Sequence, residues 1–348
     1  THLIPAPQLR RFTAAVFESC GVPAADALRA AEILVLADLR GIDSHGVARL
    51  KAYYQMLRTG KINPRPNVRV VRETASTACV DGDNGLGLVV GPKCNAIAVR
   101  KAKETGSGWV SVRNTNHYGI AGAYALECAE QFDMIGLSMT NTSPIVAPLF
   151  GKQRMLGTNP IAVAFPSADD DTPVVIDLAT SVVPFGKVEE CARLGAPLLP
   201  GWALDRDGNE CLSPEQVMTD GALRPLGGDR ARSGNKGYCL SALVDIFSAV
   251  LSGGSWGPHA GAFTTNRSNY ADAAAAAHDE SVENNFHGIG HFFGAMRIEG
   301  FRNLAAFKET MKAWCITFRT SDPVDPARPV LVPGDPEREA HARRAVSG

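Results

Sequence analysis

The sequence lacks several features that would point at once to a macromolecular partner. Its 348 residues carry a formal net charge of −1 at pH 7, and Lys and Arg form no basic block. Electrostatic attraction to nucleic acid or to an anionic membrane is therefore not expected. The chain also has no run of about 20 apolar residues and no signal-peptide pattern. We expect a protein that binds a small molecule, with neither a nucleic-acid nor a membrane partner.

Paired cysteines are missing too. The eight cysteines are scattered and never form a C-x-x-C pair, which excludes a zinc knuckle or a compact disulfide framework. Buried thiols in a reducing compartment explain them most simply, so we expect a cytoplasmic location.

His287 and His291 stand four residues apart, but two intervening glycines disfavour a helix. On a strand they would lie about 13 Å apart, so no metal site is expected.

The chain carries none of the common nucleotide or hydrolase signatures. Walker A, H-E-x-x-H and G-x-S-x-G patterns are all absent. The glycines of Gly85–Gly91 miss the dinucleotide fingerprint spacing by one residue. At the offset where an acidic residue should hold the ribose, Lys103-Glu104-Thr105 stands on a predicted helix. A Rossmann site is not expected here.

Length and periodicity predict an α/β (α+β) protein with two subdomains around a cleft. Apolar spacing predicts helices over residues 24–39, 46–59, 91–104, 119–131, 237–251 and 336–346. Short runs rich in β-branched residues predict strands over residues 68–71, 77–81, 108–112, 134–139, 161–165, 173–177 and 291–298. Residues 254–270 are expected to form a loop, and residues 271–277 are rich in alanine.

The most informative segment is Arg40–Arg49, R-G-I-D-S-H-G-V-A-R, which lies between two predicted helices. Asp43 or Ser44 is a plausible N-cap, which would put His45 at a helix N-terminus. Arg49, four residues on, would share its face. Imidazole and guanidinium could then meet one small anion, as acid/base chemistry beside a carboxylate requires. Alternatively, both side chains only decorate a capped helix.

Other candidates stand where predicted elements end. His117 follows a strand and precedes a helix, and Thr158-Asn159 lie in a turn. Asp177–Ser181 end a strand with a carboxylate and two hydroxyls, suited to ribose or amide recognition or to helix capping. Asn235 and Lys236 open a helix whose first turn could meet a phosphate. Each also has a purely structural interpretation.

Together these motifs resemble the malate/L-lactate dehydrogenase family that is unrelated to the Rossmann-type enzymes of the same names. The matching segments are Arg40–Arg49, Asp81–Gly91, Asn116–Gly119, Gly157–Pro160, Asp177–Ser181, Gly186-Lys187, Gly201–Asp205, Asn235–Gly237 and Gly290–Phe293.

This resemblance implies an oxidoreductase that uses NAD or NADP in a non-Rossmann fold with a large, mostly antiparallel sheet. Residues 1–75 with 296–348 would form a helical domain from both chain ends. Residues 76–295 would bind NAD(P) and substrate. Relatives interconvert small 2-hydroxy and 2-oxo acids of the malate and lactate type, or reduce cyclic imino acids, which is the alternative function. They usually form homodimers with active sites near the subunit interface.

The resemblance also implies roles for single residues. His45 matches the proton donor or acceptor, with His117 as its rival and Asp177 as a carboxylate that could tune it. Arg49 would bind the substrate carboxylate. Further substrate contacts are expected from Ser44, Thr158, Asn159 and Arg154. Candidates for binding a second anionic group, as malate would require, are Asn141, Thr142 and Arg154. The expected cofactor-binding residues are Asp177, Leu178, Ala179, Thr180, Ser181, Asn235, Lys236, Gly290, His291 and Phe292. Arg230 and Arg232 could reach a 2′-phosphate or could be solvated.

Overall fold

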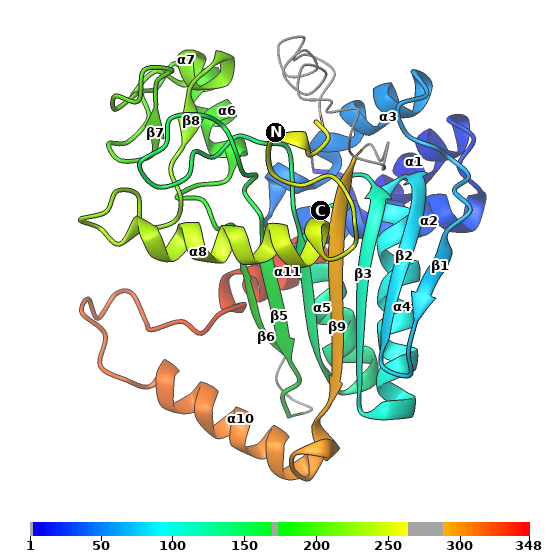
Figure 1. The fold of residues 1–348 in the computed structure, drawn as a ribbon. Coiled ribbons are helices and arrows are strands. Elements are labelled where there is room, and N and C mark those ends of the chain that lie inside the picture. Colours follow the sequence, from blue (N-terminus) through cyan, green and yellow to red (C-terminus); the bar gives the residue numbers. More distant parts are fainter. Residues whose placement is uncertain (1–2, 169–172, 264–287) are drawn as a thin grey trace.

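A seven-stranded sheet forms the centre of the computed structural model, which describes residues 3–168, 173–263 and 288–348 (Figure 1). The strand order is β1-β2-β3-β9-β4-β5-β6. Their bounds are β1 Arg69–Glu73, β2 Thr77–Gly85, β3 Ser107–Thr115, β4 Met134–Thr140, β5 Ile161–Phe165, β6 Val174–Leu178 and β9 Ile289–Arg297. β2 and β3 run parallel, whereas the other neighbouring pairs of this sheet are antiparallel. The expected large, mostly antiparallel sheet is confirmed, and the predicted strands fall within one to a few residues of the observed ones.

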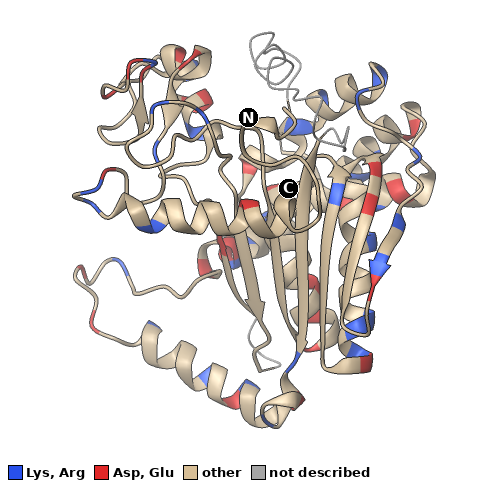
Figure 2. Ribbon diagram, in the orientation of Figure 1, with Lys and Arg blue, Asp and Glu red and all other residues tan. Residues whose placement is uncertain are grey.

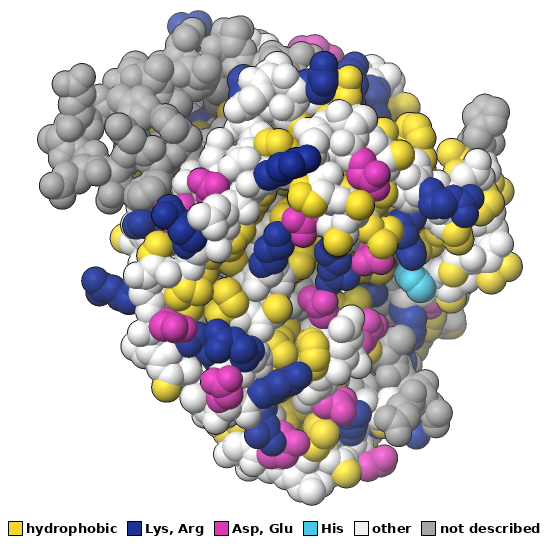
Figure 3. Space-filling view, turned by 90° about the vertical axis from the view of Figure 1, so that its right-hand side faces the viewer, with side chains coloured by type: hydrophobic (Ala, Val, Ile, Leu, Met, Phe, Trp, Pro, Cys, Tyr) yellow, Lys and Arg dark blue, Asp and Glu magenta, His cyan; other side chains and the backbone are white. Residues whose placement is uncertain are grey.

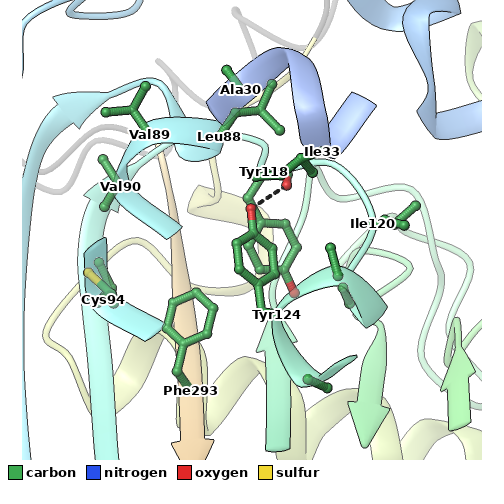
Figure 4. Packing of buried hydrophobic residues seen from close by; sticks show 14 of the residues in the cluster. Ala30, Ile33, Leu88, Val89, Val90, Cys94, Tyr118, Ile120, Tyr124 and Phe293 are labelled. Atoms are coloured by element: carbon green, nitrogen blue, oxygen red, sulfur yellow. Dashed lines mark hydrogen bonds between the residues drawn. The ribbon is translucent and has the colours of Figure 1, made fainter. Parts of the chain in front are cut away.

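Helices α4 (Gly87–Thr105) and α5 (Gly122–Phe132) cover one face of the sheet (Figure 1). At Gly87, a Cβ atom would lie 1.9 Å from the carbonyl oxygen of Asn116, so only glycine lets α4 begin so close to that loop. The core beneath is mostly aliphatic and encloses the rings of Tyr118, Tyr124 and Phe293 (Figure 4). Tyr118 and Tyr124 stack with ring centroids 4.7 Å apart, and the Tyr124 hydroxyl donates to the Tyr118 carbonyl at 2.6 Å. The glycines of Gly85–Gly91 thus serve close packing.

The opposite face carries α8 (Gly234–Asp245), which continues into a π-helical turn, η3 (Ile246–Val250). The sequence predicts this as one helix. Val244 packs against Met139 and Phe292 of the sheet. Charged residues lie mainly on helices and loops, and the central strands are nearly uncharged (Figure 2), as burial on both faces requires.

The two ends of the described chain meet in a helical layer. It contains α1 (Ala6–Ser19), α2 (Ala24–Leu39), α3 (Leu50–Arg58) and α11 (Asp335–Ser347). Arg344 of α11 forms an ion pair with Asp43 and donates to the Asp38 carbonyl at 2.6 Å. The two-domain division stays a prediction, and its boundary after residue 75 falls between the paired strands β1 and β2. Another helix, α10 (Leu304–Arg319), projects away from the sheet (Figure 1).

Residues 182–228 form a compact unit beside the sheet, which we call the small lobe (Figure 1). It contains α6 (Phe185–Leu194), β7 (Ala203–Leu204), α7 (Pro214–Thr219) and β8 (Ala222–Leu223). Its core packs against residues 145–156 and includes Val188, Leu198, Val217 and Leu223. The short 3₁₀ turns η4 (Gly257–His259) and η5 (Ile298–Gly300) precede and follow β9 in the sequence.

Acidic, basic and apolar side chains alternate over the face seen in Figure 3, without a patch of one sign. In the parts of the chain that the structure describes, no helix combines the length and apolar character needed to cross a bilayer.

Candidate active site

The segment that carries His45 and Arg49 is not the helix start that the sequence predicts. It forms two 3₁₀ turns, η1 (Asp43–His45) and η2 (Val47–Arg49), and α3 begins only at Leu50. Gly46 between the turns is extended, with φ −85° and ψ −150°. Asp38 fills the space where a Cβ of residue 46 would stand, and its carboxylate accepts the Val47 N–H at 2.9 Å. The prediction of an N-cap at Asp43 or Ser44 of such a helix was therefore wrong.

A cavity of about 650 Å³ opens between these turns, the loop after β3 and helix α6 of the small lobe. Segments that lie far apart in the sequence thus contribute to one site. The lining includes His45, Arg49, Asn116, His117, Thr140, Thr142, Ser143, Thr158, Pro160, Glu189 and Phe263. The structure therefore brings together His45, Arg49, His117 and Thr158, which the sequence singles out separately.

The two histidines lie side by side in this cavity. Their ring centroids are 5.7 Å apart with an interplanar angle of 25°, and His117 also stacks on Phe263 at 4.3 Å. Burial, with a smaller contribution from the Arg49 charge, lowers the pKa of His45 to about 4, against an opposing effect of Glu189. Burial and then the neighbouring His45 lower the pKa of His117 well below its ordinary value. Both imidazoles are therefore neutral at pH 7.

Hydrogen bonds fix the tautomer of His117. The buried Tyr53 hydroxyl lies 2.5 Å from His117 Nδ1, and the Gly119 N–H donates to the same nitrogen at 3.4 Å. Because a backbone N–H can only donate, Nδ1 must accept. The ring proton of neutral His117 then resides on Nε2. For His45, Nδ1 lies 2.7 Å from the Ser44 hydroxyl, which can either donate or accept.

Arg49 already has a partner across the cavity. Its Nε donates to the Ser44 carbonyl at 2.6 Å. Nη2 and Nη1 approach the Glu189 carboxylate oxygens at 2.9 and 3.5 Å. Helix α6 can come this close because Gly186 faces Ser44, where even a Cβ atom would lie 3.0 Å from the Ser44 Cβ. Sequence reasoning missed Glu189, and the nearest signal was the Gly186-Lys187 motif just before it.

Two other predicted substrate residues, Asn159 and Arg154, do not line the cavity but hydrogen-bond to segments around it. Asn159 is fully buried, accepts the Thr142 N–H at 3.2 Å and donates to the Ser241 carbonyl at 3.0 Å. Arg154 donates to the carbonyls of Gly221 and Val217 at 2.5 and 2.6 Å, which ties it to the small lobe. The predicted substrate contacts of Asn159 and Arg154 stay predictions.

Asp177 lies in a different place from the two histidines. Its carboxylate accepts the Gly122 N–H at 2.8 Å, and with Leu178 it lines a second pocket of about 390 Å³ beside Arg40 and Glu337. Ala179 is half-buried. Two neighbouring hydroxyls serve the backbone: Thr180 donates to the Thr158 carbonyl at 3.1 Å and Ser181 to the Val183 carbonyl at 2.7 Å. Thr180 thereby holds the turn that presents Thr158 to the cavity.

The remaining predicted cofactor residues are split between β9 and α8. Gly290, His291 and Phe292 are buried within β9, directly after Gly288 and Ile289, which line the cavity. The Gly290 N–H donates to Asn141 Oδ1 at 2.8 Å, and His291 Nδ1 lies 2.8 Å from the Thr140 hydroxyl. At the start of α8, Asn235 accepts from Arg230 at 2.6 Å and Lys236 is exposed. His287 and the alanine-rich segment fall outside the described residues.

Comparisons with known proteins show the family of this chain. The family model for malate/L-lactate dehydrogenase matches residues 4–348. Malate dehydrogenase from Pyrococcus horikoshii is 47% identical over 307 residues, 88% of this chain and 79% of that protein. Its solved structure aligns with a TM-score of 0.85 at 41% identity, covering 99% of this chain and 89% of that chain.

Two further relatives extend this picture. The structure of malate dehydrogenase from Entamoeba histolytica aligns with a TM-score of 0.89 at 34% identity, covering 100% of this chain and 93% of that one. The L-sulfolactate dehydrogenase from Methanocaldococcus jannaschii is 35% identical over 94% of this chain and 87% of its own length. The chain therefore belongs to the malate/L-lactate dehydrogenase family and is an oxidoreductase of the malate dehydrogenase type.

Proposed function

We propose that this protein interconverts L-malate and oxaloacetate with NAD(H) or NADP(H). The observation that carries the proposal is that Arg49, His45 and His117 line one cavity. A 2-hydroxy acid has a carboxylate beside the carbon that is oxidised. A guanidinium next to an imidazole matches those two groups.

In this proposal His45 is the proton acceptor for the substrate hydroxyl. A histidine whose pKa is lowered to about 4 is neutral at pH 7 and can accept a proton. If Nδ1–H donates to the Ser44 hydroxyl, the lone pair of Nε2 is available for the substrate. In the reverse direction the protonated ring returns that proton to the alkoxide oxygen.

His117 would orient the same oxygen. Its Nε2–H, fixed by Tyr53 and Gly119 at the other nitrogen, is a hydrogen-bond donor. A neutral donor of this kind stabilises negative charge on the substrate oxygen without competing for the proton. Because the two rings lie 5.7 Å apart, a charge on one disfavours a charge on the other. In this division of roles only one of the two histidines carries the additional proton at any time.

The same cavity supports a nicotinamide cofactor. Thr142 and Thr158 offer hydroxyls for a carboxamide, and Phe263 and Pro160 offer apolar surface for a flat ring. The volume of about 650 Å³ falls within the range of roughly 300 to 1,000 Å³ that is usual for small-molecule sites. When bound, the nicotinamide supplies or accepts the hydride. Arg230 and Asn235, joined at 2.6 Å, would favour NADP if they meet a 2′-phosphate.

The test is an absorbance assay with NADH and, separately, NADPH, in which oxaloacetate, pyruvate, sulfopyruvate and a cyclic imino acid are added in turn. Oxidation of the cofactor fastest with oxaloacetate is the expected result. A preference for pyruvate or sulfopyruvate would keep the reaction and change the substrate. Oxidation with the cyclic imine alone would replace the proposal by the imino-acid reductase.

Exposed apolar side chains support a homodimer. The outer side of α8 and η3 exposes Leu243, Ile246, Val250 and Leu251, and α10 exposes Trp314, Ile316 and Phe318. Patches of this kind on a protein surface commonly mark an interface. A mass in solution of twice 36.9 kDa is expected, and light scattering checks it. The eight free cysteines support a cytoplasmic location, where thiols stay reduced.

A further inference from the structure

The guanidinium that should bind the substrate carboxylate is occupied by a carboxylate of the protein itself. A bidentate pair uses two parallel N–H bonds from one edge of the guanidinium. In Arg49 the edge formed by Nη1 and Nη2 faces Glu189, at 3.5 and 2.9 Å. The other edge is blocked at Nε by the Ser44 carbonyl, 2.6 Å away. A substrate carboxylate therefore cannot form the bidentate pair while Glu189 stays in place.

The charge of the site leads to the same conclusion. Both histidines are neutral at pH 7, so the charge of Arg49 is cancelled by Glu189 and the exposed Lys51 is the one unpaired charge of the described lining. We propose that Glu189 is a displaceable internal counterion of Arg49, which the substrate carboxylate replaces and which thereby sets the affinity of this site for 2-hydroxy and 2-oxo acids. This inference rests on the proposed function, because it assigns Arg49 to the substrate carboxylate.

The surroundings of the pair allow this exchange. The side chains of Arg49 and Glu189 are 26% and 34% exposed, so water can solvate Glu189 once it is released. Partly exposed ion pairs are weak, and their loss costs little. Arg49 stays anchored through Nε to Ser44, which belongs to its own segment. Glu189 stands on α6 of the small lobe, so the exchange also breaks a contact between the two walls of the cavity.

Glu189→Gln tests the inference, because glutamine keeps the shape and removes the charge. Oxalate serves as the probe, and its dissociation constant is measured by calorimetry. We expect binding to tighten by about 3- to 10-fold and the KM for oxaloacetate to fall similarly, as loss of a weak competing pair predicts. Glu190→Gln is the matched control: Glu190 pairs with Lys187 at 2.7 Å on the exposed side of α6, and its removal should change neither value.

An Arg49→Ala background shows whether the effect passes through the guanidinium. In that background Glu189→Gln should no longer tighten oxalate binding, because the guanidinium with which Glu189 competes is absent. Unchanged or weaker oxalate binding in Glu189→Gln alone would overturn the inference and would mean that Glu189 holds Arg49 in its binding shape. If oxalate binding tightens but wild-type protein reduces no 2-oxo acid, the counterion stands and the proposed function fails.

Discussion

The two walls of the cavity rest on cores of different size. Tyr53, which contacts His117, and Tyr118, the residue that follows His117, belong to the main core, which joins α2, α4, α5 and the sheet. The wall that carries Glu189 rests on the smaller cluster around Val188 and Leu223. The groups proposed to act on the reacting carbon thus stand on the larger core. The group proposed to yield to the substrate stands on the smaller one, where local opening costs less.

The largest expected effect is that of His45→Ala, because it removes the proposed proton acceptor from the wall that rests on the larger core. In His45→Ala, turnover of oxaloacetate should fall by about 10²- to 10⁴-fold, the usual contribution of a general acid or base. Cofactor affinity, followed by NADH fluorescence, should stay unchanged. His259→Ala is the control, because His259 of η4 packs against Trp256 and does not line the cavity. Near-normal turnover in His45→Ala would mean that His117, and not His45, is the proton acceptor.

Substitution of Arg49 should affect substrate binding rather than the chemical step. Arg49→Lys keeps the charge but loses the planar fork. We expect KM for oxaloacetate to rise by about 10- to 100-fold, the cost of a lost charge-assisted hydrogen bond. Steady-state kinetics measure it, with Arg58→Lys at the exposed end of α3 as the control. An unchanged KM in Arg49→Lys would remove Arg49 from the carboxylate site.

Acid should destabilise the part of the molecule that contains the buried histidines. The small lobe, which carries Glu189, should not contribute to this effect. Burial lowers the pKa of His45 to about 4 and of His291 to about 3, whereas the unfolded chain binds these protons near 6.5. Between those values the unfolded state holds more protons, so the free energy of unfolding falls as pH falls. Each histidine adds a slope of up to about 1.4 kcal/mol per pH unit.

Residues 182–228 contain no histidine, so this slope belongs to the rest of the chain. Urea unfolding at pH values from 7 to 4 measures it, and His45→Ala should flatten the curve above pH 4. A slope that is the same in wild type and variant would mean that His45 keeps its ordinary pKa in the folded protein.

The smallest effect is expected from Tyr53→Phe. The change removes the hydroxyl from His117 Nδ1, which keeps only the 3.4 Å contact with Gly119. We expect a stability loss of about 1 kcal/mol and a several-fold lower turnover. The ¹⁵N shifts of the His117 ring report the tautomer directly. Tyr54→Phe, at an exposed neighbouring position, is the control, and unchanged stability and turnover in Tyr53→Phe would contradict the assigned role of Tyr53.

Much of the sheet could be predicted from the sequence because its strands are short apolar runs between turns. α6 and α7 were missed, since their faces are only partly buried in the small lobe. α10 was missed for a related reason: Cys315 is its one fully buried residue, whereas Trp314, Ile316 and Phe318 are exposed. A helix that does not bury its apolar residues within its own chain carries no clear core stripe.

For the site, local motifs identified the residue types but not the distances between them. His45 and Arg49 were recognised together because they share one segment. Glu189 lies 140 residues from Arg49, and only the packing of α6 against Ser44 brings it there. Asp177 was expected beside His45, and the pairing of β6 with β5 instead leads it toward Arg40 and Gly122. Such separations depend on tertiary contacts that no motif contains.

The position of β9 has a consequence for how the chain is made. This strand lies between β3 and β4, yet it is the last of the seven in sequence. Until β9 has been synthesised, β1-β2-β3 and β4-β5-β6 can form only two separate halves of the sheet, each with an open inner edge. Open edges pair readily with other chains. Folding must therefore wait for one late segment, and any truncation before Ile289 should yield a protein that aggregates.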